Sequence, residues 1–317
     1  MPLDFRDPYT DPETGVLRNK AQISTSAALG QFEFEQSKLR IEELREQPIK
    51  GKFDLNHLRT VHAYIFQDVY EWAGQFHTVN INKGGSHFAQ SAFIESAAKQ
   101  LGQSLATENN LKDKEKPEFV DRLAHYFSEW NALHPFREGN GRSTREFIGQ
   151  LAREAGYELD QTKIDNSKNQ WNEAARRSFN GYLGPIKEVF EKAIRPSRAI
   201  AFEKLPEAEA CAKFPELRSA YTGLHAIESR ARQNPSEDPK NIAGYLHQVR
   251  EAFIKRLDEG KQLEQVRTPK KEKAHEERSR WEFHLLSPEQ AREKLLEYLH
   301  RNQTIERFIA SWCWVEK

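Results

Sequence analysis

The sequence predicts a mainly α-helical protein with one β-hairpin and a mostly helical C-terminal extension. Apolar residues recur at helical spacing along most of the chain. One short stretch instead has an extended pattern around a glycine turn. Beyond residue 195 the composition becomes richer in Ala, Glu, Lys and Arg, which favours further helices. No repeat of fixed period occurs, so a solenoid or propeller is not expected.

The composition describes a folded protein that is not a general binder of polyanions. Its 317 residues include 48 Lys plus Arg and 48 Asp plus Glu, so the formal charge is zero although 30% of the residues are charged. This balance argues against bulk binding to nucleic acid or to an anionic membrane. At this length one large domain or two ordinary ones are expected, and 37% apolar residues are enough for a sizeable core.

Cysteine usage and the N-terminus indicate a reducing cytoplasm. Cys211 and Cys313 are too few for a disulfide framework. The N-terminus has no apolar signal region, and no stretch approaches the roughly 18 apolar residues of a membrane span. We therefore expect a cytoplasmic protein, while secretion into a host cell by an unconventional route stays open.

The first part of the chain is expected to be helical on both sides of the hairpin. Asp54 is a suitable N-cap, Pro117 suits a first helical turn, and Gly156 suits a left-handed helix end. Helices are predicted for residues 26–46, 54–69, 91–106, 117–133, 142–155, 169–176 and 182–194.

The extended stretch covers residues 75–88. Phe76, Val79 and Ile81 favour a strand, and Asn82-Lys83-Gly84-Gly85 is a strong turn signal. The sequence therefore predicts a β-hairpin at this place.

Arg195-Pro196-Ser197 is interpreted as a domain boundary, which gives one domain over residues 1–195 and a helical extension of unknown role over residues 196–317. The elements expected beyond the boundary are helices over residues 206–232 and 241–259, a polar linker over 261–280, a short strand over 281–285 and a helix from Ser287.

The run HPFREGNGRSTR, residues 134–145, joins two predicted helices and combines the parts of a nucleotide site. Gly139-Asn140-Gly141 at a helix start can aim consecutive backbone N–H groups at one phosphate, beside the positive end of the helix dipole. Arg142 and Arg145 lie three residues apart on one helix face, where their guanidinium groups can hold two further phosphates.

Two further residues of this run have chemical roles. Glu138 is the expected metal ligand, because Mg²⁺ binds through one or two carboxylates plus substrate phosphate oxygens. His134 ends the preceding helix, and its ordinary pKa of about 6.5 lets it accept a proton from an attacking hydroxyl near neutral pH. Pro135 and Phe136 are expected to fix the loop, with the Phe136 ring in the core.

The run matches the motif HPFx(D/E)GNGRxxR at every specified position, so the chain resembles the Fic family. Asp7-Pro8-Tyr9 and residues 65–74 and 79–85 also resemble segments of bacterial Fic toxins, and the similarity covers roughly residues 6–195. The resemblance implies a Fic-type helical domain that transfers AMP from ATP to a hydroxyl of a target protein.

The resemblance also implies the role of each site residue. It makes His134 the general base, places Mg²⁺ on Glu138 and places the terminal phosphate of ATP near Arg145. It assigns the other nucleotide phosphates to Gly139, Asn140, Gly141 and Arg142.

The same resemblance implies that the hairpin is a flap that docks the target. Backbone groups of Val79, Asn80 and Ile81 would pair with an extended target segment, and Lys83 and Gly84 would complete the docking edge. Lys83 is interpreted equally well as an ordinary turn residue.

Three other patterns carry weaker or no functional weight. His62 and His125 lack a third ligand at zinc spacing, so we interpret them as core or surface histidines and expect no zinc. His77 stands where relatives frequently carry Arg, so a contact of that Arg is not transferred. Residues 104–109 match the inhibitory motif (S/T)xxxE(G/N), but between flap and catalytic helix we judge the match coincidental, which leaves inhibition to a separate antitoxin.

The preferred interpretation is a bacterial toxin that AMPylates a protein and is restrained by a small antitoxin with an inhibitory helix. By resemblance, DNA gyrase or topoisomerase IV is the expected target, with no direct nucleic-acid or membrane partner. Three alternatives stay open: a host-directed AMPylating effector, a Doc-like protein phosphotransferase, and a partner-binding module with a vestigial Fic domain. Gly139 argues against the phosphotransferase, because the resembling kinases have Ala there.

Overall fold

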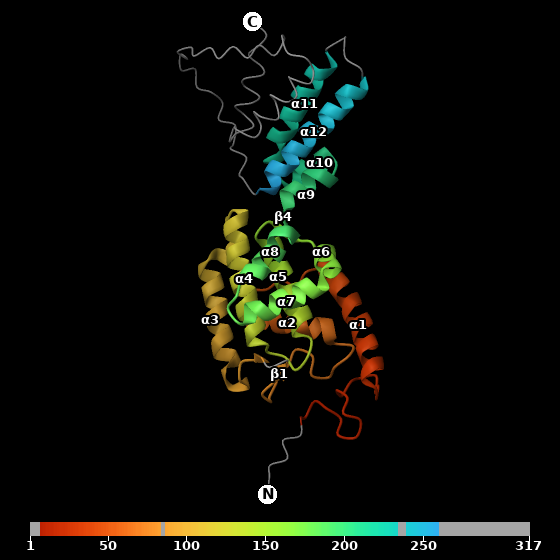
Figure 1. The fold of residues 1–317 in the computed structure, drawn as a ribbon, viewed down its shortest axis with the longest axis vertical. Coiled ribbons are helices and arrows are strands. Elements are labelled where there is room, and N and C mark those ends of the chain that lie inside the picture. Colours follow the sequence, from red (N-terminus) through yellow and green to blue (C-terminus); the bar gives the residue numbers. More distant parts are fainter. Residues whose placement is uncertain (1–6, 84–85, 234–238, 260–317) are drawn as a thin grey trace. The chain divides into compact units, whose positions relative to one another are not determined.

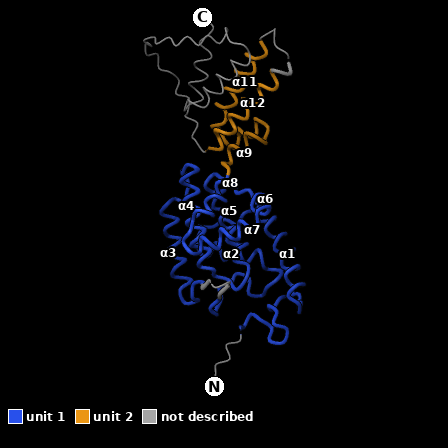
Figure 2. Tube along the Cα trace, viewed as in Figure 1, with its two compact units in different colours: residues 1–194 blue, residues 195–317 orange. Residues whose placement is uncertain are grey.

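The structure, a computed structural model, describes residues 7–83, 86–233 and 239–259 (Figure 1). The chain divides into two compact units, Met1–Ile194 and Arg195–Lys317 (Figure 2). The predicted fold class is confirmed, since the described residues are mainly helical and contain an antiparallel hairpin. The roles of the two regions, a catalytic domain and an extension, stay a prediction.

The helices of the first unit begin and end close to the predicted positions. The Asp54 side chain accepts a hydrogen bond from His57 N–H at 2.9 Å, Pro117 lies in the first turn of its helix, and Gly156 is left-handed with φ +85°. The helices are α1 (Ser26–Glu46), α2 (Leu55–Phe66), α3 (Ile94–Thr107), α4 (Lys116–Leu133), α5 (Asn140–Glu154), α6 (Gln161–Asn166), α7 (Lys168–Phe179) and α8 (Gly184–Ala193), with short 3-10 turns η1 (Ser91–Phe93) and η2 (Asn109–Leu111).

The predicted hairpin is present, but its ladder is short. β1 (Asn82–Lys83) pairs antiparallel with β2 (Ser86–His87), with Asn82 opposite His87 and Lys83 opposite Ser86. Residues 79–81 lie directly before β1 and outside this ladder. Gly84 of the predicted turn lies outside the described residues.

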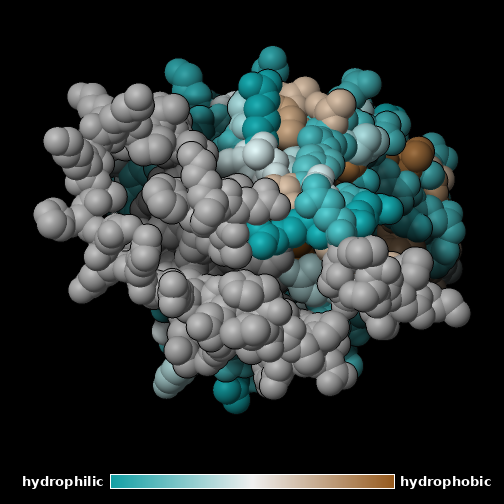
Figure 3. Space-filling view, turned by 90° about the horizontal axis from the view of Figure 1, so that it is seen from above, coloured by the Kyte–Doolittle hydropathy of each residue, from teal (hydrophilic) through white to brown (hydrophobic). Residues whose placement is uncertain are grey.

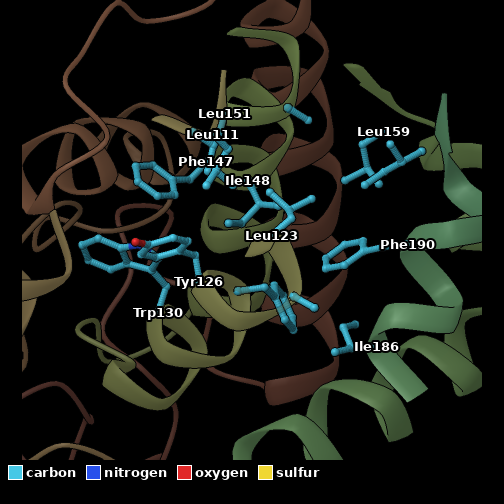
Figure 4. Close-up of a cluster of buried hydrophobic side chains, with 14 of the residues drawn as sticks. Leu111, Leu123, Tyr126, Trp130, Phe147, Ile148, Leu151, Leu159, Ile186 and Phe190 are labelled. Carbon is cyan, nitrogen blue, oxygen red and sulfur yellow. The ribbon is translucent and has the colours of Figure 1, made fainter. Parts of the chain in front are cut away.

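The main core of the first unit lies where α4 and α5 meet α8. Figure 4 shows Leu123, Trp130 and Phe147 gathered among aliphatic side chains, with Ile186 and Phe190 joining them from α8. Trp130, Phe147 and Phe190 are fully buried, and burial of a side chain of this size stabilises the fold by about 1.5–3 kcal/mol. The packing holds the end of α4 and the start of α5 in fixed relation.

A second core cluster joins α1 and α2 to the N-terminal segment. It contains Tyr9, Val16, Leu44, Ile65 and Tyr70 among other buried side chains. This cluster lies next to the loop between α4 and α5, because Phe66 of α2 belongs to it and approaches Gly139.

The second unit is helical and has its own core. Its helices are α9 (Ser197–Lys204), α10 (Glu207–Lys213), α11 (Leu217–Arg232) and α12 (Pro239–Asp258). Buried side chains of these helices, among them Phe202, Leu217 and Phe253, form one cluster. The predicted linker at 261–280, the strand at 281–285 and the helix from Ser287 lie outside the described residues.

The prediction of one helix over residues 206–232 is wrong, because the chain breaks at Phe214-Pro215. Proline has no N–H to donate and disfavours helical geometry in the residue before it. Phe214 accordingly has φ −131° and ψ 84°, and α11 begins only at Leu217. The sequence also did not indicate α6, α9 or the short strands β3 (Tyr157–Leu159) and β4 (Ile194–Pro196).

On the face shown in Figure 3, hydrophilic residues predominate and hydrophobic ones are scattered among them. Large hydrophobic side chains stand exposed in the described chain at Phe34, Leu39, Phe93 and Tyr182. Isolated residues of this kind are normal on a folded surface. Within residues 7–83, 86–233 and 239–259, no helix has both the length and the apolar character of a membrane span.

Candidate active site

The loop between α4 and α5 begins at His134, which has a left-handed backbone with φ 48° and ψ 56°. Its Nδ1 lies 3.2 Å from the carbonyl oxygen of Asn131, one turn back on α4. A carbonyl oxygen only accepts hydrogen bonds, so Nδ1 must carry the proton. In the neutral ring the lone pair is therefore on Nε2, which is the atom able to act as a base.

Asn140, the first residue of α5, holds the loop from within. Its Oδ1 accepts the N–H of Phe136 at 2.9 Å, and its Nδ2 donates to the carbonyl oxygen of Phe136 at 2.6 Å. The Asn140 side chain is buried, and Phe136 is fully buried as expected. Because both ends of this buried amide are engaged with Phe136, the backbone N–H of Asn140 is the donor that it offers to a phosphate in the nest.

Gly139 allows the loop to pass close to α2. Its φ is +83°, and a Cβ atom at this position would lie 2.3 Å from the Phe66 ring. Both the backbone conformation and the space therefore require glycine. The first helical hydrogen bond of α5 runs from Ser143 N–H to the Gly139 carbonyl at 3.1 Å. The N–H groups of residues 140–142 precede it and point out of the helix end, as an anion nest requires.

Glu138 lies against this nest. Its Oε1 accepts the N–H of Gly139 at 2.9 Å, and its side chain is half-buried. No cluster of three or more His, Cys, Asp or Glu able to hold a metal is found among the described residues. The donors at this site fit Mg²⁺, which takes one carboxylate and completes its shell with phosphate oxygens and water.

His62 of α2 connects two segments by hydrogen bonds: the loop between α4 and α5, called the motif loop below, and the segment after α2. Its Nε2 donates to the Glu138 carbonyl oxygen at 2.9 Å, and its Nδ1 accepts the N–H of Gly74 at 2.9 Å. The ring stacks on Phe136 with centroids 3.8 Å apart. Burial lowers the pKa of His62 to about 3, so the ring stays neutral. His62 is therefore a core histidine, which is one of the two interpretations that the sequence left open.

The two motif arginines contact different elements rather than sharing a face toward one site. Arg142 lies over the Phe66 ring, 4.8 Å from its centroid, and donates to Glu33 and to Ser37 Oγ, the latter at 3.0 Å, on α1. Glu33 also accepts a hydrogen bond from Tyr70. Burial, together with this hydrogen bond, raises the pKa of Tyr70. Arg142 is thus half-buried in a polar cluster that the sequence did not reveal.

Arg145 points toward α6. Its guanidinium donates to Asp165 at 3.0 Å, and the Asp165 side chain is 59% exposed. An exposed pair of this kind contributes little to stability and can exchange its partner for a phosphate.

The N-terminal segment contacts the motif directly. Arg137 Nε donates to Asp7 at 3.0 Å. Burial raises the pKa of Asp7, but hydrogen bonds from Arg137, Tyr9 N–H and Thr10 outweigh it and leave the pKa below its ordinary value. The Tyr9 hydroxyl in turn accepts the N–H of Thr78 at 3.1 Å, just before the predicted docking residues. The Asp7-Pro8-Tyr9 run therefore links the motif loop to the base of the flap.

The flap begins beside the motif. His77 is buried, and its backbone N–H donates to the Pro135 carbonyl at 3.0 Å. Beyond it, Val79 and Ile81 are partly buried and Asn80 is exposed. Within the described chain, these three residues make no backbone–backbone hydrogen bond. They are therefore unpaired with other described backbone, which is a condition for docking of an extended target segment.

The residues that matched the inhibitory motif have a structural role. Glu108 accepts two hydrogen bonds from Arg122, with the Nε contact at 2.8 Å, and one from the Tyr126 hydroxyl at 2.7 Å. The hydrogen bonds from Arg122 lower the pKa of Glu108. Glu108 ties the end of α3 to α4, in agreement with our judgement that the match is coincidental.

The helical unit and its histidine, glycine and arginine loop define a Fic protein, and the chain belongs to the Fic/DOC family. A sequence profile of this family matches residues 52–152. The chain is 48% identical over 178 residues to protein adenylyltransferase VbhT of Bartonella schoenbuchensis. The aligned stretch covers 56% of this chain and 36% of VbhT. It is 40% identical over 190 residues to "Probable protein adenylyltransferase Fic" of Escherichia coli, and this alignment covers 60% of this chain and 92% of that protein.

Solved structures show the same fold. The N-terminal Fic domain of a VirB-translocated Bep effector protein of Bartonella quintana, with bound ADP, is 28% identical with a TM-score of 0.58 and covers 61% of this chain and 96% of that chain. BepC of Bartonella tribocorum, with bound AMPPNP, is 28% identical with a TM-score of 0.55. The match covers 59% of this chain and 96% of that chain. The names of the relatives confirm the predicted enzyme class, a nucleotidyltransferase.

Proposed function

We propose that this chain transfers AMP from ATP to a hydroxyl side chain of a target protein. The observation that carries the proposal is the position of His134 next to the nest of α5: its Nδ1 proton is bound to Asn131, so Nε2 is the base, and Glu138 lies on the nest. Relatives named protein adenylyltransferases and Fic structures with bound ADP and AMPPNP support ATP as the donor.

In this reaction the target hydroxyl oxygen attacks the α-phosphorus of ATP. The bond between the α-phosphorus and the bridging oxygen breaks, pyrophosphate leaves, and the hydroxyl proton moves to His134 Nε2. Phosphoryl chemistry of this kind depends mainly on positioning and charge stabilisation. The N–H groups of Asn140 and Gly141 would stabilise phosphate charge. The N–H of Gly139 would join them after leaving Glu138 Oε1, and Arg145 would do so after leaving Asp165.

Glu138 would hold Mg²⁺, which supplies charge neutralisation at the phosphates when bound. The backbone of Val79, Asn80 and Ile81 would dock the target as an added strand, and the family resemblance adds Lys83 and Gly84 to this docking edge. The short ladder of β1 and β2 supports this role, because residues 79–81 make no backbone–backbone hydrogen bond with the residues that the structure describes.

Two labels on ATP distinguish this reaction from a phosphotransferase reaction. Bacterial lysate is incubated with the enzyme and with ATP that carries the label on either the α or the γ phosphate. We expect protein bands labelled from α and not from γ, and no bands with His134→Ala. Label from γ without label from α would instead support a Doc-like kinase, and the absence of any label would contradict enzymatic function.

We further propose that the enzyme is a bacterial toxin that acts in the cytoplasm and is inhibited by a separate antitoxin chain. The hydrogen bonds of Glu108 support this proposal. Glu108 is the glutamate of the one internal match to the inhibitory motif, and Arg122 and Tyr126 of α4 already bind its carboxylate. Mass spectrometry of the labelled bands tests the target. Modified subunits of DNA gyrase or topoisomerase IV in the bacterial lysate would support the proposal. Labelled bands in a parallel incubation with host-cell lysate, and none in the bacterial lysate, would favour an effector.

A further inference from the structure

Phe88, the residue directly after β2, lies flat against the ring of His134. The two ring centroids are 3.7 Å apart and the rings are inclined by 11°. We propose that Phe88 is a positioning residue that fixes the orientation of the His134 imidazole and couples it to the flap. This inference rests on the proposed function, in which His134 is the base.

The flat contact gives the His134 ring a restraint that a hydrogen bond at one edge does not supply. The Nδ1 contact with the Asn131 carbonyl, at 3.2 Å, fixes one edge of the imidazole but does not by itself set its tilt about that bond. His134 is also the first residue of the loop, outside the regular turns of α4. A ring at van der Waals distance on one face blocks this tilt and so holds Nε2 in one direction.

Phe88 is itself held in place from two sides. The ring of Phe179, at the end of α7, meets it edge-on with centroids 5.4 Å apart and planes at 76°. The next residue, Ala89, donates its N–H to the Ala132 carbonyl at 3.4 Å, two residues before His134. The stack on His134 is therefore part of a packed arrangement and not one rotamer of an exposed side chain.

The position of Phe88 links the flap to the base His134. β2 pairs with β1, and the proposed docking residues 79–81 lead directly into β1. The strand that leaves this ladder reaches Phe88 within one residue of His87. The flap that would carry the target hydroxyl and the base that would accept its proton are thus fixed to each other through one aromatic ring.

Phe88→Leu removes the flat face and keeps an apolar side chain. In the full chain we expect kcat for α-label transfer to protein to fall at least about tenfold, since a misdirected base costs that much or more. The KM for ATP should stay within about twofold, because the phosphate contacts do not involve Phe88. Phe88→Tyr keeps the ring face and should restore most of kcat.

A measurement without substrate tests the same idea. Nitrogen NMR of the imidazole should show the Nδ1–H tautomer of His134 in the wild type and in Phe88→Tyr. It should show a mixture of tautomers in Phe88→Leu, because a ring that can turn about its side-chain bonds carries Nδ1 away from the Asn131 carbonyl. Phe93→Leu is the matched control, because Phe93 lies in the same segment with its side chain 59% exposed, and it should change neither readout. If Phe88→Leu does not fold, Phe88→Met serves in its place.

Equal kcat and a single tautomer in the non-aromatic variants would overturn the role of Phe88. Failure of the proposed function gives a different pattern, in which the wild type transfers no label at all while the tautomer still depends on Phe88.

Discussion

Gly139 is the residue whose replacement the structure restricts most clearly. Its left-handed backbone disfavours a side chain, and the Phe66 ring leaves no room for one, because it lies 2.3 Å from the place that a Cβ atom would take. We expect Gly139→Ala to lower the free energy of unfolding by about 2 kcal/mol or more, from backbone strain and overpacking together. Chemical denaturation of the two proteins measures the difference.

Gly141→Ala is the matched stability control for this prediction. A Cβ at Gly141 meets no atom within 4 Å, and the residue lies in the first turn of α5. Alanine should therefore leave stability unchanged or raise it by up to about 1 kcal/mol. Equal destabilisation by both substitutions would mean that Phe66 moves aside at no cost and that the close approach at Gly139 has no energetic weight.

At the scale of single residues, the sequence predicted the side chains of the proposed chemistry. It did not predict the contacts that keep those side chains in position. His134, Glu138 and the Gly139 turn stand in one contiguous run, so local spacing was enough to bring them together. The partner of Arg142, Glu33, lies 109 residues earlier in the chain, and no local pattern encodes such a contact. Phe88 likewise meets His134 only through the fold of the flap.

At the scale of elements, helix α2 makes the folding stability depend on pH, because it carries His62. In the folded protein the pKa of His62 is about 3, against an ordinary value of 6.5. Between these values the unfolded chain binds a proton at His62 and the folded chain does not. Stability therefore falls as the pH falls through this window, with a slope from this residue of up to about 1.4 kcal/mol per pH unit.

His62→Gln tests this contribution, since an amide can donate to the Glu138 carbonyl and accept from Gly74 without titrating. We expect a shallower loss of stability in the variant between pH 6 and pH 4, measured by urea unfolding at each pH. Thr60→Ala on the exposed side of the same helix should shift the curve without changing its slope. Parallel curves for wild type and His62→Gln would show that His62 is not protonated on unfolding in this range.

At the scale of elements, helices with a clear start signal were predicted well: α2 begins after the Asp54 cap, and α4 has Pro117 in its first turn. Short elements were missed because α6 and β3 contain too few residues to establish a period. The error over residues 206–232 came from favouring helical composition over Pro215, whose missing N–H ends the hydrogen-bond ladder.

At the scale of the whole molecule, the described side chains form separate cores in the two units. The main cluster of the first unit ends at Ile194, and the cluster of the second begins at Ala199. We expect a protein of residues 1–196 to fold and to transfer label from ATP as the full chain does. Calorimetry should show one transition for the fragment at a temperature within about 5 °C of a transition of the full chain.

A fragment that folds but transfers no label would show that the second unit takes part in catalysis or target binding. An insoluble fragment would show that the first unit depends on the rest of the chain for its stability. The reciprocal fragment, residues 197–317, is the companion for this comparison, and it should transfer no label.

The left-handed backbone of His134 has a consequence for the choice of an inactive enzyme. At φ 48° an alanine is disfavoured by about 1 kcal/mol or more, whereas asparagine adopts this conformation far more readily. An alanine variant therefore loses the imidazole and also loosens the turn that starts the motif loop. A paired asparagine variant separates the two losses, and it is the more suitable form for capturing the enzyme with its bound nucleotide and target.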